Sequence, residues 1–335
     1  MLNMHTPKEI LLETLKPDGK PERLLEQFEA FSVVMNDPCQ RYTRGMREKG
    51  KTVKDRWGTT IVWPADQHAA MPHVTADNKV LPDVTRWREY IHVPDLVANC
   101  TDWTDCVHDA EEIRKKGDTM VLGFMGTGVF EECHHLMGFE DTLSNLLIEP
   151  EAMHELIDVI GEFRLTYAKL LVDNLKPDCI LSHDDWGNKT NLFMHPDVWR
   201  EFFKPQYVKI YGYMKDHGVL VMHHADSYCE QIVEDMVDIG IDIWQGVLNT
   251  NNIPKIQREL NGKMTLMGGI DSWIDRRESE EPEIRAEVRR AMNEYAPGGH
   301  YIPCITYGGP GTIFPHVDPI ITDEIRKYNK EHYNA

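Results

Sequence analysis

The sequence predicts an α/β protein folded as a single distorted (β/α)8 barrel, the TIM-barrel class. Apolar runs of strand length alternate with helical patterns from about residue 117 onwards, as in parallel sheets whose strands are joined by helices. At least six such strands occur in 335 residues, which favours a barrel over an open sheet. No GxGxxG or Walker motif points to a nucleotide-binding sheet. No break in composition divides the chain, so residues 1–335 are predicted as one domain.

The first 115 residues are predicted as an N-terminal helix followed by an irregular segment. Thr6, Pro7 and Glu9 form the pattern of an N-cap, a first-turn proline and a capping box. Residues 34–110 are rich in Trp, Pro, His and Asp, and we interpret them as short strands and long loops that act as a lid over a site.

The regular part of the chain supplies the barrel elements. Strands are predicted at 119–126, 179–187, 219–226, 241–247, 265–271 and 300–309. Helical patterns cover about 130–175, 196–218 with an interruption near Pro205, a face around Ile232 to Val237, 253–260 and 281–296.

Composition and charge exclude several classes of function. The formal net charge of −19 and the lack of a dense Lys/Arg run argue against nucleic-acid binding, although a protein partner with a basic rim remains compatible. The N-terminus lacks the apolar core of a signal peptide, and no stretch approaches the roughly 18 apolar residues of a membrane span. Seven scattered cysteines are typical of a reducing compartment, so we expect a cytoplasmic protein.

Polar residues gather where the predicted strands end. Because the chemistry of such barrels lies at the carboxyl ends of the strands, this distribution predicts an enzyme. The residues are His183, Asp184, Asp185, His223, His224, Asp226, Gln245, Asp271, Cys304, Thr306 and Tyr307.

The stretch MHHADSYC (222–229) raises the question of a metal site. Alternate residues of a strand share a face, so His224 and Asp226 point one way and His223 the other. An imidazole and a carboxylate form a plausible half of a zinc site, and Cys304 is the best candidate for a third ligand. The alternative is a hydrogen-bonded pair beside a loop. Further ligands from one helix are conceivable at Glu131 or Glu132 and at His134 or His135.

Asp184 and Asp185 follow an apolar strand directly. Neighbouring carboxylates beside His183 and Trp186 predict either substrate positioning or acid–base catalysis. The alternative is that one carboxylate caps the next helix while the other is solvated. The glycine-rich run CITYGGPGTIFP (304–315) lacks Lys and Arg, so we interpret it as a tight turn that shapes the site.

These residues together resemble a known family. The chain resembles the uroporphyrinogen decarboxylase superfamily, and within it most closely the corrinoid-dependent methyltransferase branch. The resemblance covers nearly the whole chain, is loose in 34–110, and implies a distorted barrel. It is carried by HDDWGNK (183–189), PDVWREFFKPQY (196–207), VLVMHHADSY (219–228), GIDIWQGV (240–247), LMGGID (266–271) and the opening KEILLETLKPDGKPERL (8–24).

The resemblance also implies a zinc site. In that branch zinc is held by a His-x-Cys pair and a distant cysteine. Aligning the helix EQIVEDMVDIGID (230–242) without gaps places His224 on the histidine and Asp226 on the first cysteine, with Cys304 nearest to the second. A carboxylate in place of a thiolate makes the metal a harder Lewis acid, which indicates a methyl donor bound through oxygen.

Porphyrinogen decarboxylation itself is not expected. The decarboxylases hold the substrate carboxylates with an N-terminal RQAGR motif, whereas this chain has Arg41, Arg44 and Arg47 in another arrangement. The net charge of −19 also disfavours a polyanionic substrate.

The expected function is therefore a zinc-dependent methyltransferase that works with the cobalamin of a corrinoid protein. Asp184, Asp185 and His183 are the expected catalytic residues; Trp186, Trp244, Gln245, Tyr307 and Asp271 are expected to bind substrate. Two alternatives stay open: a metal-independent lyase or decarboxylase that uses the two aspartates, and a non-catalytic module that binds a corrinoid protein. The methyl donor, the direction of transfer and the oligomeric state are not specified by the sequence.

Overall fold

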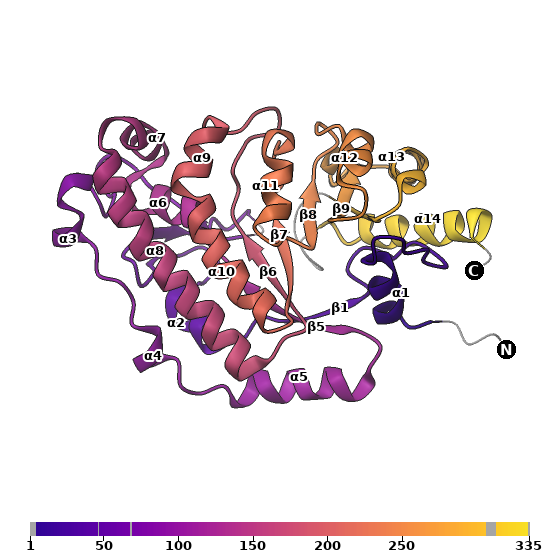
Figure 1. Ribbon diagram of the computed structural model, residues 1–335, viewed down its shortest axis with the longest axis horizontal. Coiled ribbons are helices and arrows are strands. Elements are labelled where there is room, and N and C mark those ends of the chain that lie inside the picture. The colour runs from indigo at the N-terminus through magenta and orange to yellow at the C-terminus, as the bar shows by residue number, and fades with distance from the viewer. Residues whose placement is uncertain (1–4, 46, 68, 306–312, 334–335) are drawn as a thin grey trace.

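A seven-stranded parallel sheet forms the centre of the molecule, as the computed structural model shows for residues 5–45, 47–67, 69–305 and 313–333 (Figure 1). Every neighbouring pair of strands is parallel, and the strand order follows the sequence. The α/β barrel class is confirmed, with seven strands among the described residues where eight were predicted. The strands are β1 (Phe31–Val34), β5 (Met120–Met125), β6 (Cys179–His183), β7 (Leu220–His224), β8 (Ile243–Val247), β9 (Thr265–Ile270) and β10 (Tyr301–Ile305).

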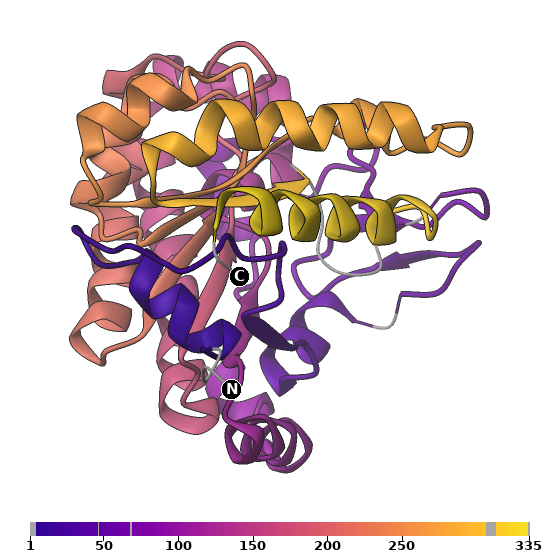
Figure 2. The ribbon, with the colours of Figure 1, turned by 90° about the vertical axis from the view of Figure 1, so that its right-hand side faces the viewer.

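Helices cover the outside of this sheet (Figures 1 and 2). The predicted helical region 130–175 is divided, because Gly138 adopts a φ of 93° after one helix and Pro150 begins another. The helices are α1 (Pro7–Thr14), α2 (Pro38–Arg44), α3 (Trp87–Tyr90), α4 (Leu96–Asn99), α5 (Thr104–Lys116), α6 (Val129–Met137), α7 (Phe139–Ile148), α8 (Pro150–Leu170), α9 (Pro196–Phe202), α10 (Lys204–Asp216), α11 (Val233–Asp238), α12 (Ile253–Leu260), α13 (Glu281–Tyr295) and α14 (Val317–His332).

The terminal helices differ in how well they were predicted. The capping box at the start of α1 is confirmed, since the Thr6 side chain accepts from Glu9 N and the Glu9 carboxylate accepts from Thr6 N. Helix α14 was not predicted, and it lies beside α13 (Figure 2), where Arg285 donates to Glu324 across 3.0 Å.

The sheet separates two apolar layers, because successive side chains of a strand point to opposite faces. The outer layer lies between strands and helices. The inner layer is joined by Ile10 and Leu11 of α1. The amino end of the barrel is packed in this way, which leaves the carboxyl ends of the strands for polar chemistry. The inner layer receives Met120, Leu122, Cys179, Met222, Ile243, Met267, Ile302 and Cys304 from the strands.

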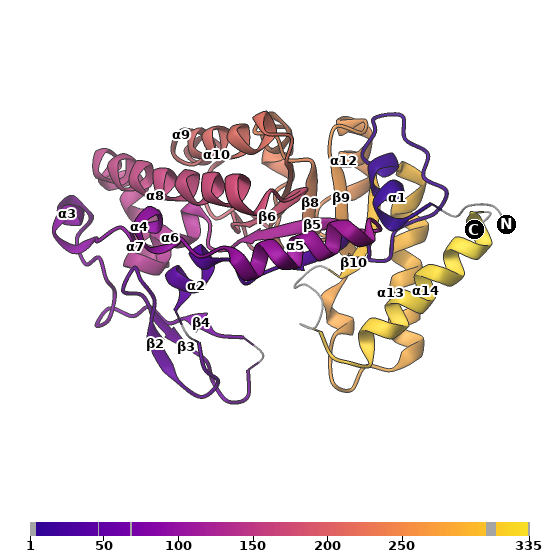
Figure 3. The ribbon, with the colours of Figure 1, turned by 90° about the horizontal axis from the view of Figure 1, so that it is seen from below.

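A second, small antiparallel sheet projects from the barrel (Figure 3). It consists of β2 (Thr52–Lys54), β3 (Thr60–Val62) and β4 (Met71–Pro72). The segment is attached to α6 and its end, where Thr59 Oγ1 donates to the carbonyl of His135 (3.2 Å) and Leu81 N donates to that of Leu136 (2.9 Å). The short strands expected in 34–110 are therefore present, but helices α2, α3, α4 and the start of α5 also lie there and were not predicted. The lid role stays a prediction.

Asp37 gives the fold a testable dependence on pH. It caps α2 by accepting from Gln40 N (3.0 Å), and both of its carboxyl oxygens accept from the Tyr167 hydroxyl (3.0 Å). Burial raises the pKa of Asp37 from 3.8 to about 6, despite these hydrogen bonds. A carboxyl with a raised pKa in the folded state stabilises the fold while protonated. That contribution is complete below pH 3.8 and is lost as the pH rises through about 6.

We therefore expect Asp37→Asn to become more favourable, relative to the natural chain, as the pH rises. The difference in free energy of unfolding should change by on the order of 3 kcal/mol between pH 4 and pH 7.5, and urea denaturation at both pH values measures it. A difference that does not vary with pH would contradict this assignment.

Candidate metal centre

Three polar side chains lie level with one another on adjacent strands. In the strand register His183 of β6 is opposite His224 of β7, and His224 is opposite Gln245 of β8. These positions follow the inward-facing residues of each strand by two, so all three side chains enter the barrel at its carboxyl end. The position of this group agrees with the usual place of catalytic groups in such barrels.

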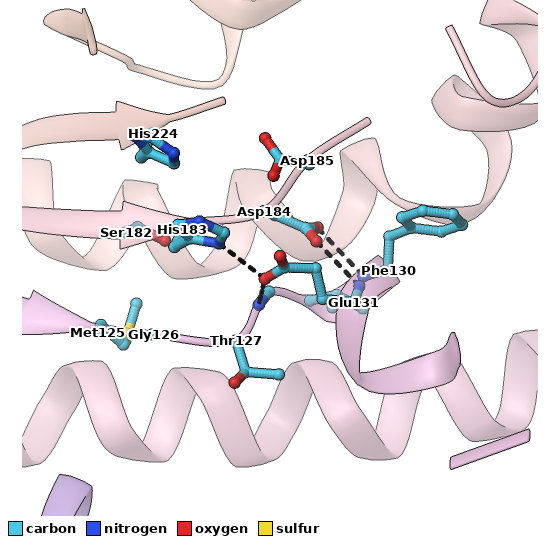
Figure 4. A network of polar contacts seen from close by, with 12 residues as sticks. Met125, Gly126, Thr127, Phe130, Glu131, Ser182, His183, Asp184, Asp185 and His224 are labelled. Carbon is cyan, nitrogen blue, oxygen red and sulfur yellow. Dashed lines mark hydrogen bonds and ion pairs between the residues drawn. The ribbon is translucent and has the colours of Figure 1, made fainter. Parts of the chain in front are cut away.

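The two imidazoles and a carboxylate form a cluster that can hold a metal ion. The rings of His183 and His224 stack with centroids 4.5 Å apart and planes 18° apart. One ligand atom from each of His183, Asp185 and His224 lies within 4.8 Å of the others. Figure 4 shows Asp185 and His224 on neighbouring chain segments beside His183. Two nitrogens and one carboxylate oxygen are donors that zinc accepts, with room for a further ligand.

Each imidazole is held through its Nδ1 atom. His183 Nδ1 lies 2.9 Å from Glu131 Oε2, and His224 Nδ1 makes a short hydrogen bond with Gln245 Oε1. An oxygen acceptor at Nδ1 places the proton there and presents Nε2 as the metal-binding nitrogen. The residues present therefore fit a metal ion, both in donor type and in the support of the two ligands.

The two histidines differ in charge. Burial by itself disfavours the charged form of His183, but the Glu131 carboxylate outweighs it and raises the pKa of His183 to about 9. Burial, together with the charge of His183, lowers the pKa of His224 to about 3. A divalent cation would thus compete with one proton on His183 and find His224 already neutral.

Asp184 serves the start of α6. Its carboxylate accepts from Phe130 N (3.1 Å), Glu131 N (2.9 Å), Trp186 Nε1 (2.9 Å) and, in a short hydrogen bond, the Tyr207 hydroxyl. The side chain is fully buried, and Figure 4 shows it directed at the first turn of the helix. Gly128, the residue before α6, has no room for a side chain, since a Cβ there would lie 2.0 Å from the Asp184 carboxyl carbon. The geometry thus gives Asp184 an anchoring role.

Asp185 and Asp226 lie together at the mouth. The backbone N of Asp226 donates to Asp185 Oδ1 across 3.0 Å, and both side chains are partly exposed. Burial raises the pKa of the Asp185 carboxyl, and it raises that of Asp226 to about 6. Asp226, which the sequence predicted as a metal ligand, lies beside Asp185, whereas the close group of ligand atoms comes from His183, Asp185 and His224.

Cys304 is not part of the group formed by His183, Asp185 and His224. It is fully buried in the inner apolar layer, and its Sγ is 3.8 Å from Gln27 Oε1. Burial raises the pKa of its thiol, which disfavours the thiolate that a metal requires. The Gln245 side chain lies beside both this thiol and His224. The structure thus brings His224 together with His183 and Asp185, and keeps Cys304 one side chain away.

The residues predicted to bind substrate lie in different environments. Trp186 and Trp244 are fully buried in the outer layer, where the Trp244 indole donates to the carbonyl of Ala225 (3.0 Å). Asp271 is partly exposed after β9 and accepts from Asn249 Nδ2 (2.9 Å). Gln245 is buried against His224, and Tyr307 falls outside the described residues.

Comparisons with known proteins identify the family. Residues 58–319 match the family model described as uroporphyrinogen decarboxylase. The chain belongs to the uroporphyrinogen decarboxylase family.

The similar proteins include both decarboxylases and a methyltransferase. The uroporphyrinogen decarboxylase of Ralstonia pickettii (strain 12J) is 20% identical over 234 residues, which are 63% of this chain and 58% of that protein. That of Bacillus anthracis is 22% identical over 227 residues, 64% and 60% of the two chains. The chain thus matches less than two thirds of the length of these relatives. A methyltransferase from Methanosarcina mazei superposes with a TM-score of 0.68 over 97% of this chain and 99% of its own, at 16% identity.

In this member of the uroporphyrinogen decarboxylase family, two residues beside the cluster make contacts that the sequence did not predict. The sequence considered Glu131 only as a further metal ligand, whereas in the structure its carboxylate contacts His183. Its position three residues after Gly128, in the first turn of α6, is the sequence pattern of a helix N-terminal cap. Arg164 on α8 was missed. Its guanidinium donates to Ser182 Oγ (2.9 Å) and, in short bonds, to the carbonyls of Gly126 and Thr127.

None of the helices within the described ranges is both long and apolar enough to cross a membrane.

Proposed function

We propose that this protein is a metal-dependent methyltransferase that moves a methyl group between a small methylated substrate and the corrinoid cobalt of a partner protein. The observation that carries the proposal is the cluster of His183, Asp185 and His224, whose imidazoles are both held through Nδ1 at the carboxyl end of the barrel. The resemblance of residues 183–189 and 219–228 to the corrinoid-dependent methyltransferases supports the choice of reaction.

Zinc is the proposed metal, and methoxylated compounds are the proposed substrates. Bound zinc would act as a Lewis acid that polarises the oxygen carrying the methyl group. Two imidazoles and a carboxylate form a harder donor set than thiolates, and a hard centre suits an oxygen ligand. O-demethylation is therefore the favoured reaction.

The residues around the proposed metal site have separate proposed roles. His183, Asp185 and His224 hold the metal, while Glu131 and Gln245 orient the two rings. Asp226, which is partly exposed beside Asp185, is proposed to contact the substrate. Asp184 and Arg164 fix the loop and the first turn of α6 around the site, and so keep the metal ligands in register.

The function is tested by methyl transfer to free cob(I)alamin, followed by its absorbance, with methoxylated compounds as donors. We expect about one zinc ion per chain in protein purified without a tag, loss of transfer after chelation, and recovery with zinc. Lyase or decarboxylase activity that survives chelation would replace this proposal with the metal-independent alternative. Tight binding of a corrinoid protein with no turnover of any donor would indicate the non-catalytic alternative.

A further inference from the structure

We propose that Glu131 is the positioning residue of the metal centre and makes His183 the stronger of its two imidazole ligands. The inference rests on the proposed metal dependence, and it adds that the two imidazoles bind the metal with different strength. His183 pairs with a carboxylate, whereas His224 pairs with the neutral amide of Gln245. A carboxylate at Nδ1 increases the basicity of the opposite nitrogen, and an amide does so less.

The place of Glu131 is set by the helix that carries it. A single carboxylate oxygen, Oε2, accepts both from the backbone N of Gly128 (2.9 Å) and from His183 Nδ1 (2.9 Å). Figure 4 shows both contacts converging on that oxygen. The capping contact at the start of α6 thus holds the carboxylate still for His183. Moving the carboxylate away would break a helix cap as well as the imidazole contact.

His183, the last residue of β6, and Asp184, which follows it, both hold this helix. His183 contacts the Glu131 side chain, and Asp184 accepts from the backbone N of the same Glu131 (2.9 Å) and of Phe130 (3.1 Å). The first turn of α6 is therefore held both at the Glu131 side chain and at its backbone N–H groups. Glu131 is also buried, so water competes little for its oxygen. The carboxylate–imidazole pair is therefore pre-oriented before a metal binds.

Gln245 provides the internal comparison. Its Oε1 accepts from His224 Nδ1, while its Nε2 is buried with no hydrogen-bond partner among the residues described. The amide offers an acceptor of the right shape but no full charge. Glu131→Gln would give His183 the kind of partner that His224 already has, so it isolates the effect of the charge from the effect of the geometry.

The experiment is a Zn²⁺ and Co²⁺ titration of the full chain and its variants. We expect Glu131→Gln to bind 10- to 100-fold more weakly, on the order of outer-sphere substitutions in other metal sites, and Glu131→Ala to bind more weakly still. The Co²⁺ absorption bands should shift in Glu131→Ala, and the Nδ1–H resonance of His183 in ¹⁵N-histidine spectra should be lost. Glu140→Gln, an exposed carboxylate on the next helix, is the matched control and should bind like the natural chain.

The outcomes separate the two proposals. Natural-like affinity and spectra in both Glu131 variants, with metal bound to the natural chain, would overturn the role of Glu131 alone. A natural chain that binds neither metal would overturn the proposed function and this inference with it. If Glu131→Ala does not fold, Glu131→Gln decides the matter, because it keeps the size of the side chain and an acceptor oxygen.

Discussion

Replacing His183 or His224 by alanine is expected to abolish the proposed metal binding, and with it the proposed methyl transfer. Each substitution takes away one of the two imidazole nitrogens from a cluster of three donors. Alanine offers no ligand atom in its place. We expect zinc affinity to fall by on the order of 100-fold or more, beyond the 10- to 100-fold of outer-sphere changes. Elemental analysis of dialysed protein and competition with a chromogenic chelator measure the loss.

His217→Ala is the control, since this exposed histidine follows α10 at the other end of the barrel and should leave metal binding unchanged. The aspartates and the cysteine then distinguish two ligand sets. Asp185→Asn should lose the metal, while Asp226→Asn and Cys304→Ser should retain it. The reverse result would favour the set His224, Asp226 and Cys304 that the sequence predicts.

Asp184→Ala will destabilise the fold more than any substitution at the mouth. The change leaves four buried donors without their acceptor: two backbone N–H groups of α6, an indole and a hydroxyl. Each orphaned donor costs about 1–3 kcal/mol, and partial relaxation should leave a total loss of about 3–5 kcal/mol in the free energy of unfolding.

Urea denaturation at pH 7.5 measures this loss. Asp216→Ala is the matched control, because that carboxylate is exposed at the end of α10 and its removal should change stability by less than about 0.5 kcal/mol. A loss below about 1 kcal/mol in Asp184→Ala would mean that Asp184 is not an anchor. Its predicted catalytic role would then gain support.

Much of the fold followed from local patterns. The six predicted strands are all present, because each is an apolar run of five or six residues bounded by turn residues. Strand β1 was missed, since its four residues are FSVV and only the first and last are buried. Helix α14 was also missed, and its ion pairs with α13 depend on residues about 40 positions apart.

The candidate site, like the fold, was predicted from the sequence only in part. The sequence by itself determined that polar residues end the strands, and that His224 and Asp226 share a strand face. Which of them meet was decided by the tertiary structure, since the pairing of β6 with β7 brings His183 level with His224. Cys304 instead packs among the apolar residues of the inner layer.

The contact between Glu131 and His183 depends on how separate elements pack against each other. Glu131 reaches His183 across 52 positions because Asp184 accepts the first N–H groups of α6 and draws that helix onto the strand end. Periodicity specifies which face a side chain occupies. The distance between two faces depends on how separate elements pack, and that is a property of the tertiary structure.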